Sequence, residues 1–121
     1  MDWIEHRRSD DRELLGWIAP DGEHFVPFDR LGRPVGEATD WLSAEERLEE
    51  RGIGWLADLW QLTVHGVVER VRIVEVTPER VVVKRDDLGS IDAPLHTWTL
   101  TFPAPAELRP FEGDPGVISG L

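Results

Sequence analysis

The sequence predicts an α+β protein that is mostly β. Three observations predict this class: a helix whose two ends both carry capping residues, one strand with strict alternation of apolar and hydroxyl side chains, and short β-branched or aromatic runs separated by turn residues. We expect an N-terminal three-stranded antiparallel sheet, one short helix over about residues 43–51, and a C-terminal SH3-like barrel or curled β-meander.

The N-terminal sheet is expected from three short runs separated by turn signals. They are Trp3–Arg8, Glu13–Ala19 and Glu23–Asp29. Pro20-Asp21-Gly22 predicts a hairpin between the second and third runs, because proline presets φ and glycine accepts the left-handed position. Pro27 cannot donate a ladder hydrogen bond, so we expect the third strand at a sheet edge or with a bulge.

The helix is expected to begin at Ser43 and to end before Gly52. Ser43 and Glu46 have the spacing of a capping box, in which each side chain bonds the other residue's backbone N–H. Gly52 stands where a left-handed residue ends a helix, and Ile53 stands where a Schellman motif places its apolar contact with Leu48.

The C-terminal meander is expected from five β-rich runs bounded by Gly, Pro or Asp. They are Trp60–His65, Val67–Val76, Arg80–Asp86, His96–Pro103 and Ala104–Phe111. In the fourth run three large apolar residues alternate with three threonines. We therefore expect Trp98, Leu100 and Phe102 to be buried and Thr97, Thr99 and Thr101 to face water.

The length of 121 residues fits one ordinary domain. We expect a single compact domain over residues 1–111, built from the N-terminal sheet (1–38), the helix with a Trp-rich connector (39–62) and the meander (63–111). Residues 112–121 are rich in glycine and lack periodicity, which predicts a loose tail.

Composition and charge exclude several classes of function. The chain has no cysteine, which excludes disulfides, thiol nucleophiles and zinc–thiolate or iron–sulfur sites, and no cofactor is expected. The net charge is −11, and the sequence shows no basic stripe of the kind that nucleic-acid binding requires. We therefore expect no direct binding to nucleic acid. No apolar run is long enough to span a membrane, and no secretion signal is visible, so we expect a cytoplasmic protein.

The stretches GWIAPDG, FDRLGRP, DWLSAEERL and GIGWLAD carry a resemblance over about residues 14–62. There the chain resembles a family of small bacterial proteins that are functionally uncharacterised. The resemblance supplies no activity and no residue role.

Asp86, Asp87 and Asp92 lie within one short loop around a glycine, and oxygen ligands on such a loop suit a hard cation such as calcium. The spacing does not match an EF-hand, and the alternative is a polar loop with Asx turns. Among the histidines, His96 is the candidate ligand-binding residue, because it could converge with these carboxylates. No histidine has a His or Cys partner at zinc-ligand spacing.

Trp55, Asp58 and Trp60 are the candidate partner-binding residues, because two indoles and a carboxylate stand close to glycines in the connector. The alternative is that the tryptophans belong to the core. No nucleophile context and no pair of histidines indicates catalysis. We therefore expect a non-catalytic protein-interaction or regulatory module that binds a protein partner or itself; a small-molecule or metal-binding domain is the second class, and an enzyme of unknown class the third.

Overall fold

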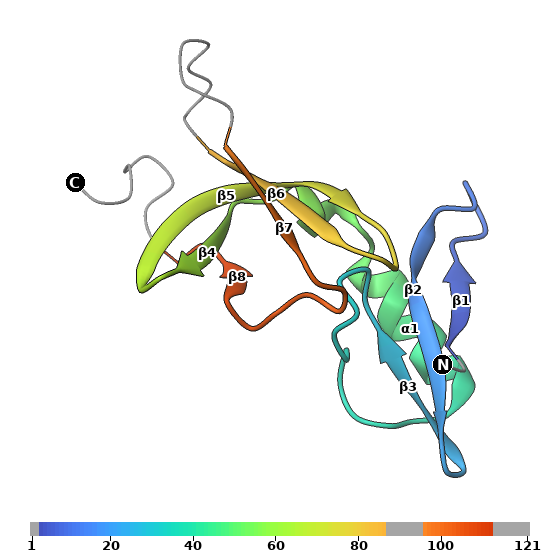
Figure 1. Ribbon diagram of the computed structural model, residues 1–121. Helices are drawn as coiled ribbons and strands as arrows, with labels where there is room; N and C mark the ends of the chain where they lie inside the picture. The colour runs from blue at the N-terminus through green and yellow to red at the C-terminus, as the bar shows by residue number, and fades with distance from the viewer. Residues whose placement is uncertain (1–2, 87–95, 113–121) are drawn as a thin grey trace. The chain divides into compact units, whose positions relative to one another are not determined.

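The computed structural model describes residues 3–86 and 96–112 (Figure 1). The chain divides into two compact units, an N-terminal unit (Met1–Trp55) and a C-terminal unit (Leu56–Leu121). The single compact domain expected over residues 1–111 stays a prediction. The predicted tail lies outside the described residues except for Glu112.

The N-terminal unit contains a three-stranded antiparallel sheet in the order β1-β2-β3 and one α-helix, as the sequence predicts. Its elements are β1 (Ile4–Arg7), β2 (Leu14–Asp21), β3 (His24–Phe28) and α1 (Trp41–Arg51). Gly22 takes a φ of 62° in the turn between β2 and β3, which confirms the hairpin at Pro20-Asp21-Gly22. A register shift between His6 and Arg7 marks a bulge where β1 meets β2.

Strand β3 lies at the edge of this sheet, as Pro27 predicts. The following segment returns along that edge and covers part of it. Phe25 exchanges two backbone hydrogen bonds with Thr39, at 2.7 and 2.8 Å, and the N–H of Val35 donates to the Pro27 carbonyl at 2.8 Å. The edge is therefore largely paired within the N-terminal unit.

The start of α1 differs from the prediction. The helix begins at Trp41, and its N-cap is Asp40, whose carboxylate accepts from the Ser43 N–H at 2.9 Å and from the Ser43 hydroxyl at 2.9 Å. Aspartate is one of the preferred N-cap residues, and Asp40 has the usual N-cap spacing of three residues to the Ser43 N–H. The predicted capping box of Ser43 with Glu46 is therefore wrong.

The end of α1 is as predicted. Gly52 has a φ of 62°, and its N–H donates to the Leu48 carbonyl at 3.0 Å. Ile53 packs against the buried cluster to which Leu48 belongs, in agreement with the apolar contact expected after the helix.

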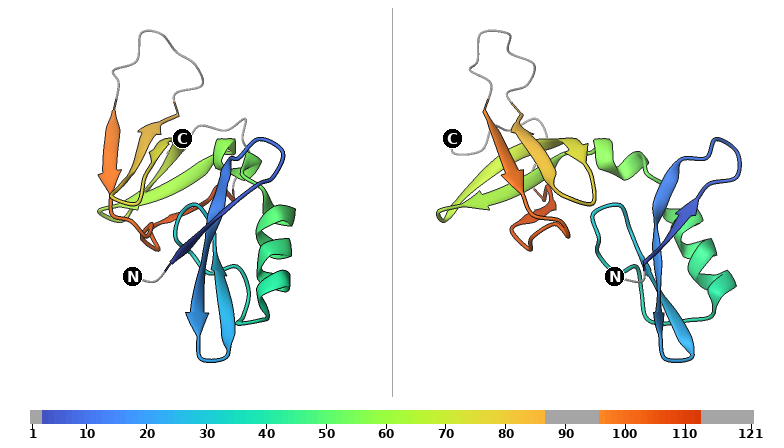
Figure 2. Two further views of the ribbon diagram at one scale, coloured as in Figure 1. Left: turned by 90° about the vertical axis from the view of Figure 1, so that its right-hand side faces the viewer. Right: turned by 45° about the vertical axis from the view of Figure 1, so that its right-hand side comes forward.

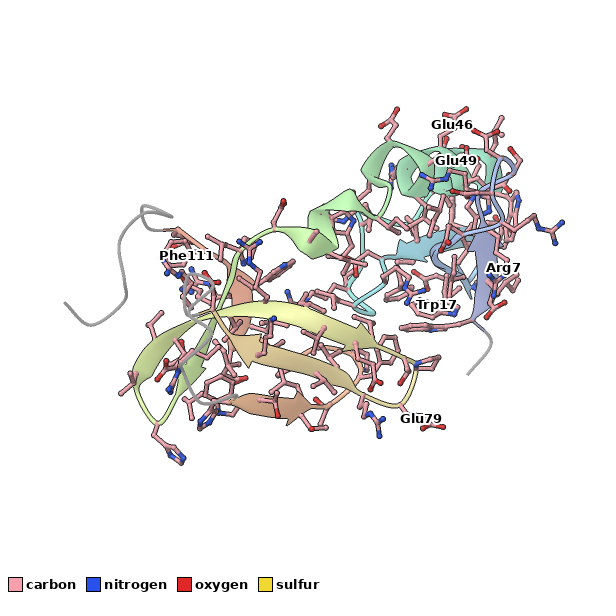
Figure 3. All side chains as sticks on the ribbon, turned by 90° about the horizontal axis from the view of Figure 1, so that it is seen from above. Arg7, Trp17, Glu46, Glu49, Glu79 and Phe111 are labelled. Carbon is pink, nitrogen blue, oxygen red and sulfur yellow. The ribbon has the colours of Figure 1, made fainter. Side chains whose placement is uncertain are left out.

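The core of the N-terminal unit lies between α1 and one face of the sheet (Figure 2). It is formed by Leu15, Ile18, Ala44 and Leu48. Each of the four is at most 1% exposed. Burial of each leucine or isoleucine side chain stabilises the fold by roughly 1.5–3 kcal/mol. Figure 3 shows Glu46 on the outer side of the helix and Trp17 on the other side of the sheet.

The C-terminal unit is a five-stranded antiparallel sheet in the order β7-β6-β5-β4-β8. Its strands are β4 (Trp60–Val64), β5 (Val67–Val76), β6 (Val81–Arg85), β7 (Thr97–Leu100) and β8 (Leu108–Pro110), and a short 3₁₀ helix, η1 (Gly54–Ala57), precedes them. The last strand returns to pair with the first, and the sheet does not close into a barrel within the described residues. Its core is buried on one face and includes Trp60, Leu62, Val71, Val81, Val83 and Leu108.

Strand β7 shows the predicted alternation with less burial than expected. Thr97, Thr99 and Thr101 are exposed, whereas Trp98, Leu100 and Phe102 are only partly buried. The strand also ends at Leu100 rather than at Pro103. The expectation of full burial fails because β7 is the outermost strand of its sheet and packs against a neighbour on one side only.

We expect two glycines to differ in their tolerance of alanine. Gly52→Ala should lower the free energy of unfolding by about 1 kcal/mol, because a Cβ is disfavoured at positive φ while no atom lies within 4 Å of it. Gly16→Ala should cost more, about 3 kcal/mol, because its Cβ would overlap the carbonyl oxygen of Phe28. Urea unfolding of both variants measures the difference. Equal midpoints would contradict the close approach at Gly16.

Candidate interaction site

Asp86, one of the three predicted metal ligands, pairs with arginines. Its Oδ2 lies 3.0 Å from Nε of Arg70, and its Oδ1 lies 3.9 Å from Nε of Arg72. Arg70 is 2% exposed, so its charge requires a carboxylate close by. Asp87 and Asp92 lie outside the described residues. In residues 3–86 and 96–112 no group of three or more His, Asp or Glu side chains is arranged to hold a metal ion.

His96 is exposed and lies against Trp98, with the two ring centroids 4.3 Å apart. Its carbonyl accepts a hydrogen bond of 2.9 Å from the Arg85 N–H, so His96 and Arg85 are opposite each other on neighbouring strands. Side chains on opposite positions share a face, which places His96 with Arg85 and not with the next residue, Asp86. The predicted convergence of His96 with the carboxylate loop is therefore not observed at Asp86.

Trp98 instead lies within a small cluster on one face of the C-terminal sheet. The Arg85 guanidinium carbon lies 5.6 Å from the Trp98 ring centroid. Glu69 pairs with Arg85, with 3.3 Å between Oε2 and Nε. A partly exposed indole with a cation beside it is typical of surfaces that bind apolar or aromatic groups. We call Glu69, Arg85, His96 and Trp98 the Trp98 cluster.

The backbone of β7 is available for pairing on its outer side. In an antiparallel ladder every second residue exchanges both backbone hydrogen bonds with its opposite neighbour. Because the Arg85 N–H bonds to His96, every second residue after His96 also bonds towards β6. These residues are Trp98 and Leu100. The N–H and C=O groups of Thr97 and Thr99 then point away from the sheet. No described strand pairs with β7 on that side.

The other three edge strands are protected, each in a different way. Charged Glu5 and Arg7 lie within β1, and β3 is bridged by the segment that follows it. Strand β8 has three residues and contains Arg109 and Pro110. Charge, proline, short length and covering segments are the means by which soluble proteins block edge pairing.

Strand β7 lacks two of these protections, charge and proline, and no described segment pairs with its outer side. Its sequence, Thr-Trp-Thr-Leu, contains neither a charge nor a proline. A β-branched and aromatic strand without charge is well suited to pair with another chain. This edge, together with the Trp98 cluster, is the candidate interaction site. The sequence shows the absence of charge from residue 97 to residue 100, but it does not show that this strand lies at an edge.

The connector residues take separate places. The Trp55 ring lies under the Arg51 guanidinium, 4.1 Å from its central carbon, and the Trp55 Nε1 donates to the Gly52 carbonyl at 2.9 Å. Asp58 is exposed. Trp60 is 3% exposed and lies within β4, so it is a core residue of the C-terminal sheet. Of the three predicted partner-binding residues, Trp55 is partly exposed, Asp58 is exposed and Trp60 is buried.

Arg51 also pairs with the buried carboxylate of Asp29, at 3.4 Å. Asp29 is 4% exposed and accepts from the N–H groups of Leu31 and Arg33, at 2.9 and 3.2 Å. These bonds shape the loop between β3 and the segment that covers it. The arrangement was not predicted, although an Asp at the start of a Gly-containing turn is a known signal for it.

His6 joins β1 to α1 through two glutamates. Its Nδ1 lies 3.3 Å from Glu45 Oε2, and its Nε2 lies 3.7 Å from Glu49 Oε1. The His6 side chain is 12% exposed. These contacts link β1 to α1 within the N-terminal unit, because Glu45 and Glu49 lie on the helix and His6 lies on the strand.

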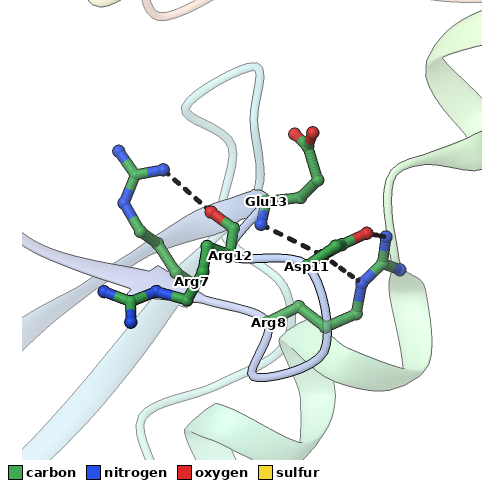
Figure 4. Close-up of polar contacts among 5 residues, drawn as sticks. All are labelled: Arg7, Arg8, Asp11, Arg12 and Glu13. Carbon is green, nitrogen blue, oxygen red and sulfur yellow. Dashed lines mark hydrogen bonds and ion pairs between the residues drawn. The ribbon is translucent and has the colours of Figure 1, made fainter.

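The turn between β1 and β2 holds the largest shift in pKa (Figure 4). Arg8 donates to both carboxylate oxygens of Asp11, at 3.1 and 2.7 Å, and the Glu13 N–H donates to Oδ1 at 3.1 Å. The hydrogen bonds from Arg8, followed by the one from Glu13, lower the pKa of Asp11 to about 2. The pair fixes the turn between β1 and β2.

No protein-family model, curated protein or solved structure matches this chain. Neither α1 nor any other helix among the described residues is both long enough and apolar enough to cross a membrane.

We expect the Asp11 carboxyl to titrate near pH 2 in an NMR titration of the full chain. Because its pKa is depressed in the folded state, the stabilisation of the turn is present above the ordinary value of 3.8 and is lost as the pH falls through about 2. Arg8→Gln should move the midpoint towards 3.8, whereas Arg109→Gln should leave it unchanged. A midpoint near 3.8 in the unaltered protein would contradict the bidentate pair.

Proposed function

We propose that this protein is a non-catalytic interaction module that binds an extended protein segment along β7. The observation that carries the proposal is that β7 is an edge strand without charge or proline, whose Thr97 and Thr99 backbone groups point outward. Addition of a strand to such an edge is a recurring mode of peptide recognition.

The site supplies both of the contributions that strand addition needs. Thr97 and Thr99 offer two N–H donors and two C=O acceptors, which bind any extended backbone regardless of its sequence. Trp98 offers apolar area on one face of the added strand, and this contact selects among side chains. Arg85 is already paired with Glu69, so the cluster carries little net charge towards a partner.

Trp55 and Asp58 in the connector are a second pair of candidates for partner binding, and that role stays a prediction. The cation site at Asp87 and Asp92 and a catalytic role also stay predictions. The described residues bring no further carboxylate or histidine to Asp86 that would support the cation site.

The finer fold assignment and the location are proposals of the same kind. The meander whose last strand, β8, returns to pair with the first, β4, supports an SH3-like arrangement for the C-terminal unit. The net charge of −11 supports a protein partner over a nucleic acid. The cytoplasmic location stays a prediction from the sequence.

A display library of random peptides tests the proposal with the full chain as bait. We expect selected peptides to bind the unaltered protein and Thr99→Val about equally, because valine keeps the backbone donor. Thr99→Pro removes the outward N–H while the bonds to β6 stay, so it should weaken binding about tenfold or more. Thermal unfolding monitored by circular dichroism confirms that both variants are folded.

Two results would count against an interaction module at β7. One is a library that yields no binder to the folded protein. The other is a set of binders that Thr99→Pro and Thr99→Val affect equally, since the backbone edge would then play no part.

A further inference from the structure

We infer that the segment that pairs with β7 is the β7 strand of a second copy, in an antiparallel dimer with two-fold symmetry. This inference rests on the proposed function and names the partner. It begins from the symmetry of the strand itself, in which two outward-pointing threonines flank Trp98. A two-fold interface requires a surface that is complementary to itself, and such a strand meets that requirement.

The outward backbone groups fix the register of the dimer. Pairing Thr97 of one copy with Thr99 of the second copy is the register that satisfies the outward N–H and C=O groups of both threonines in both copies. The same pairing is repeated with the copies exchanged. Trp98 then lies opposite Trp98 of the second copy, at the centre and in a position without hydrogen bonds between the pair. The two five-stranded sheets become one continuous sheet.

The side chains agree with this register on both faces. The two indoles meet on the face of the Trp98 cluster, where aromatic pairs across neighbouring strands are favourable. The threonines meet on the other face, where each is exposed in the single chain. Threonine pairs across strands are also favourable, and no charge lies within the interface.

Among the described residues, the charges on the strand next to β7 do not oppose the interface. Lys84 and Arg85 lie on β6, and Arg85 is paired with Glu69. Three strand spacings separate the two copies of β6, roughly 14 Å, which exceeds the screening length of roughly 8 Å in physiological salt. The opposing term is the net charge of −11 on each copy. Salt should therefore strengthen the dimer, whereas it would weaken docking of a basic peptide.

Other edges of a second copy fit β7 less well. Strand β8 has three residues, and Pro110 offers no N–H to a partner. Strand β1 would bring Glu5 and Arg7 against uncharged threonines. Strand β3 already bonds to the segment that follows it. Each of these pairings would also join different surfaces, which leads to open assemblies rather than to a closed dimer.

Sedimentation of the full chain tests the inference, over protein concentrations from about 1 μM to about 1 mM. A four-residue strand buries little area, so we expect a dissociation constant on the order of 100 μM. Thr99→Lys should raise that constant about tenfold or more, because it places a cation on each copy within the interface. Val68→Lys adds the same charge to an exposed position on the inner strand β5 and should change the constant by less than about threefold.

Disulfide trapping tests the register. The chain has no cysteine, so single substitutions give clean cross-links. In the proposed register a mixture of Thr97→Cys and Thr99→Cys should form disulfide-linked dimers faster than either variant alone, because residue 97 faces residue 99 of the second copy. Val68→Cys serves as the control for random collision.

Three outcomes would overturn the inference. They are a protein that stays monomeric at about 1 mM, a dimer that responds equally to Thr99→Lys and Val68→Lys, and a mixture that cross-links no faster than its components. A monomer that still binds library peptides through the Thr99 backbone would overturn the second copy as partner and leave the interaction module standing. A monomer that binds no peptide would overturn both.

Discussion

Backbone hydrogen bonding at the edges of two open sheets is the constraint on which the rest of this structure depends. A sheet that does not close leaves two rows of N–H and C=O groups without neighbours, and these groups are costly when they are hidden from water without partners. The N-terminal unit resolves one of its edges internally, through the bonds between Phe25 and Thr39. The buried Asp29 carboxylate holds the turn that starts the covering segment, and Arg51 at the end of α1 pairs with it. The helix, the loop and the edge are thus stabilised together.

The sequence predicted the features that depend on neighbouring residues. The left-handed position of Gly52 and the hairpin at Pro20-Asp21-Gly22 follow from the limited conformations of proline and the freedom of glycine. The start of the helix was misplaced because Asp40 and Ser43 are both good N-caps, and they bond to each other. The side chains near the helix start therefore fit either Asp40 or Ser43 as the N-cap. The packing of Trp41 against the core cluster agrees with the earlier start.

The candidate site could not be predicted, because it depends on strand order rather than on the strands themselves. The runs that became β4 to β8 were recognisable, yet nothing within Trp98 and its neighbours shows that their strand is outermost. Strand order is set by distant pairing, above all that of β8 with β4, where Leu62 lies opposite Leu108. For the same reason the pairing of Asp86 with the buried Arg70 was missed, since the two residues are brought together only across the sheet.

The meaning of the uncharged β7 depends on whether a charged side chain in this strand would destabilise the C-terminal sheet. Thr97 and Thr99 are exposed on the face opposite to the core, so a lysine or glutamate at either position would disturb no packing. Threonine there contributes its strand propensity rather than packing against the core. Trp98 contributes to the sheet and remains partly exposed, so a neighbouring strand beyond the edge would bury more of its ring. The uncharged edge and the partly exposed indole are the two features of the single chain on which the proposed pairing of β7 depends.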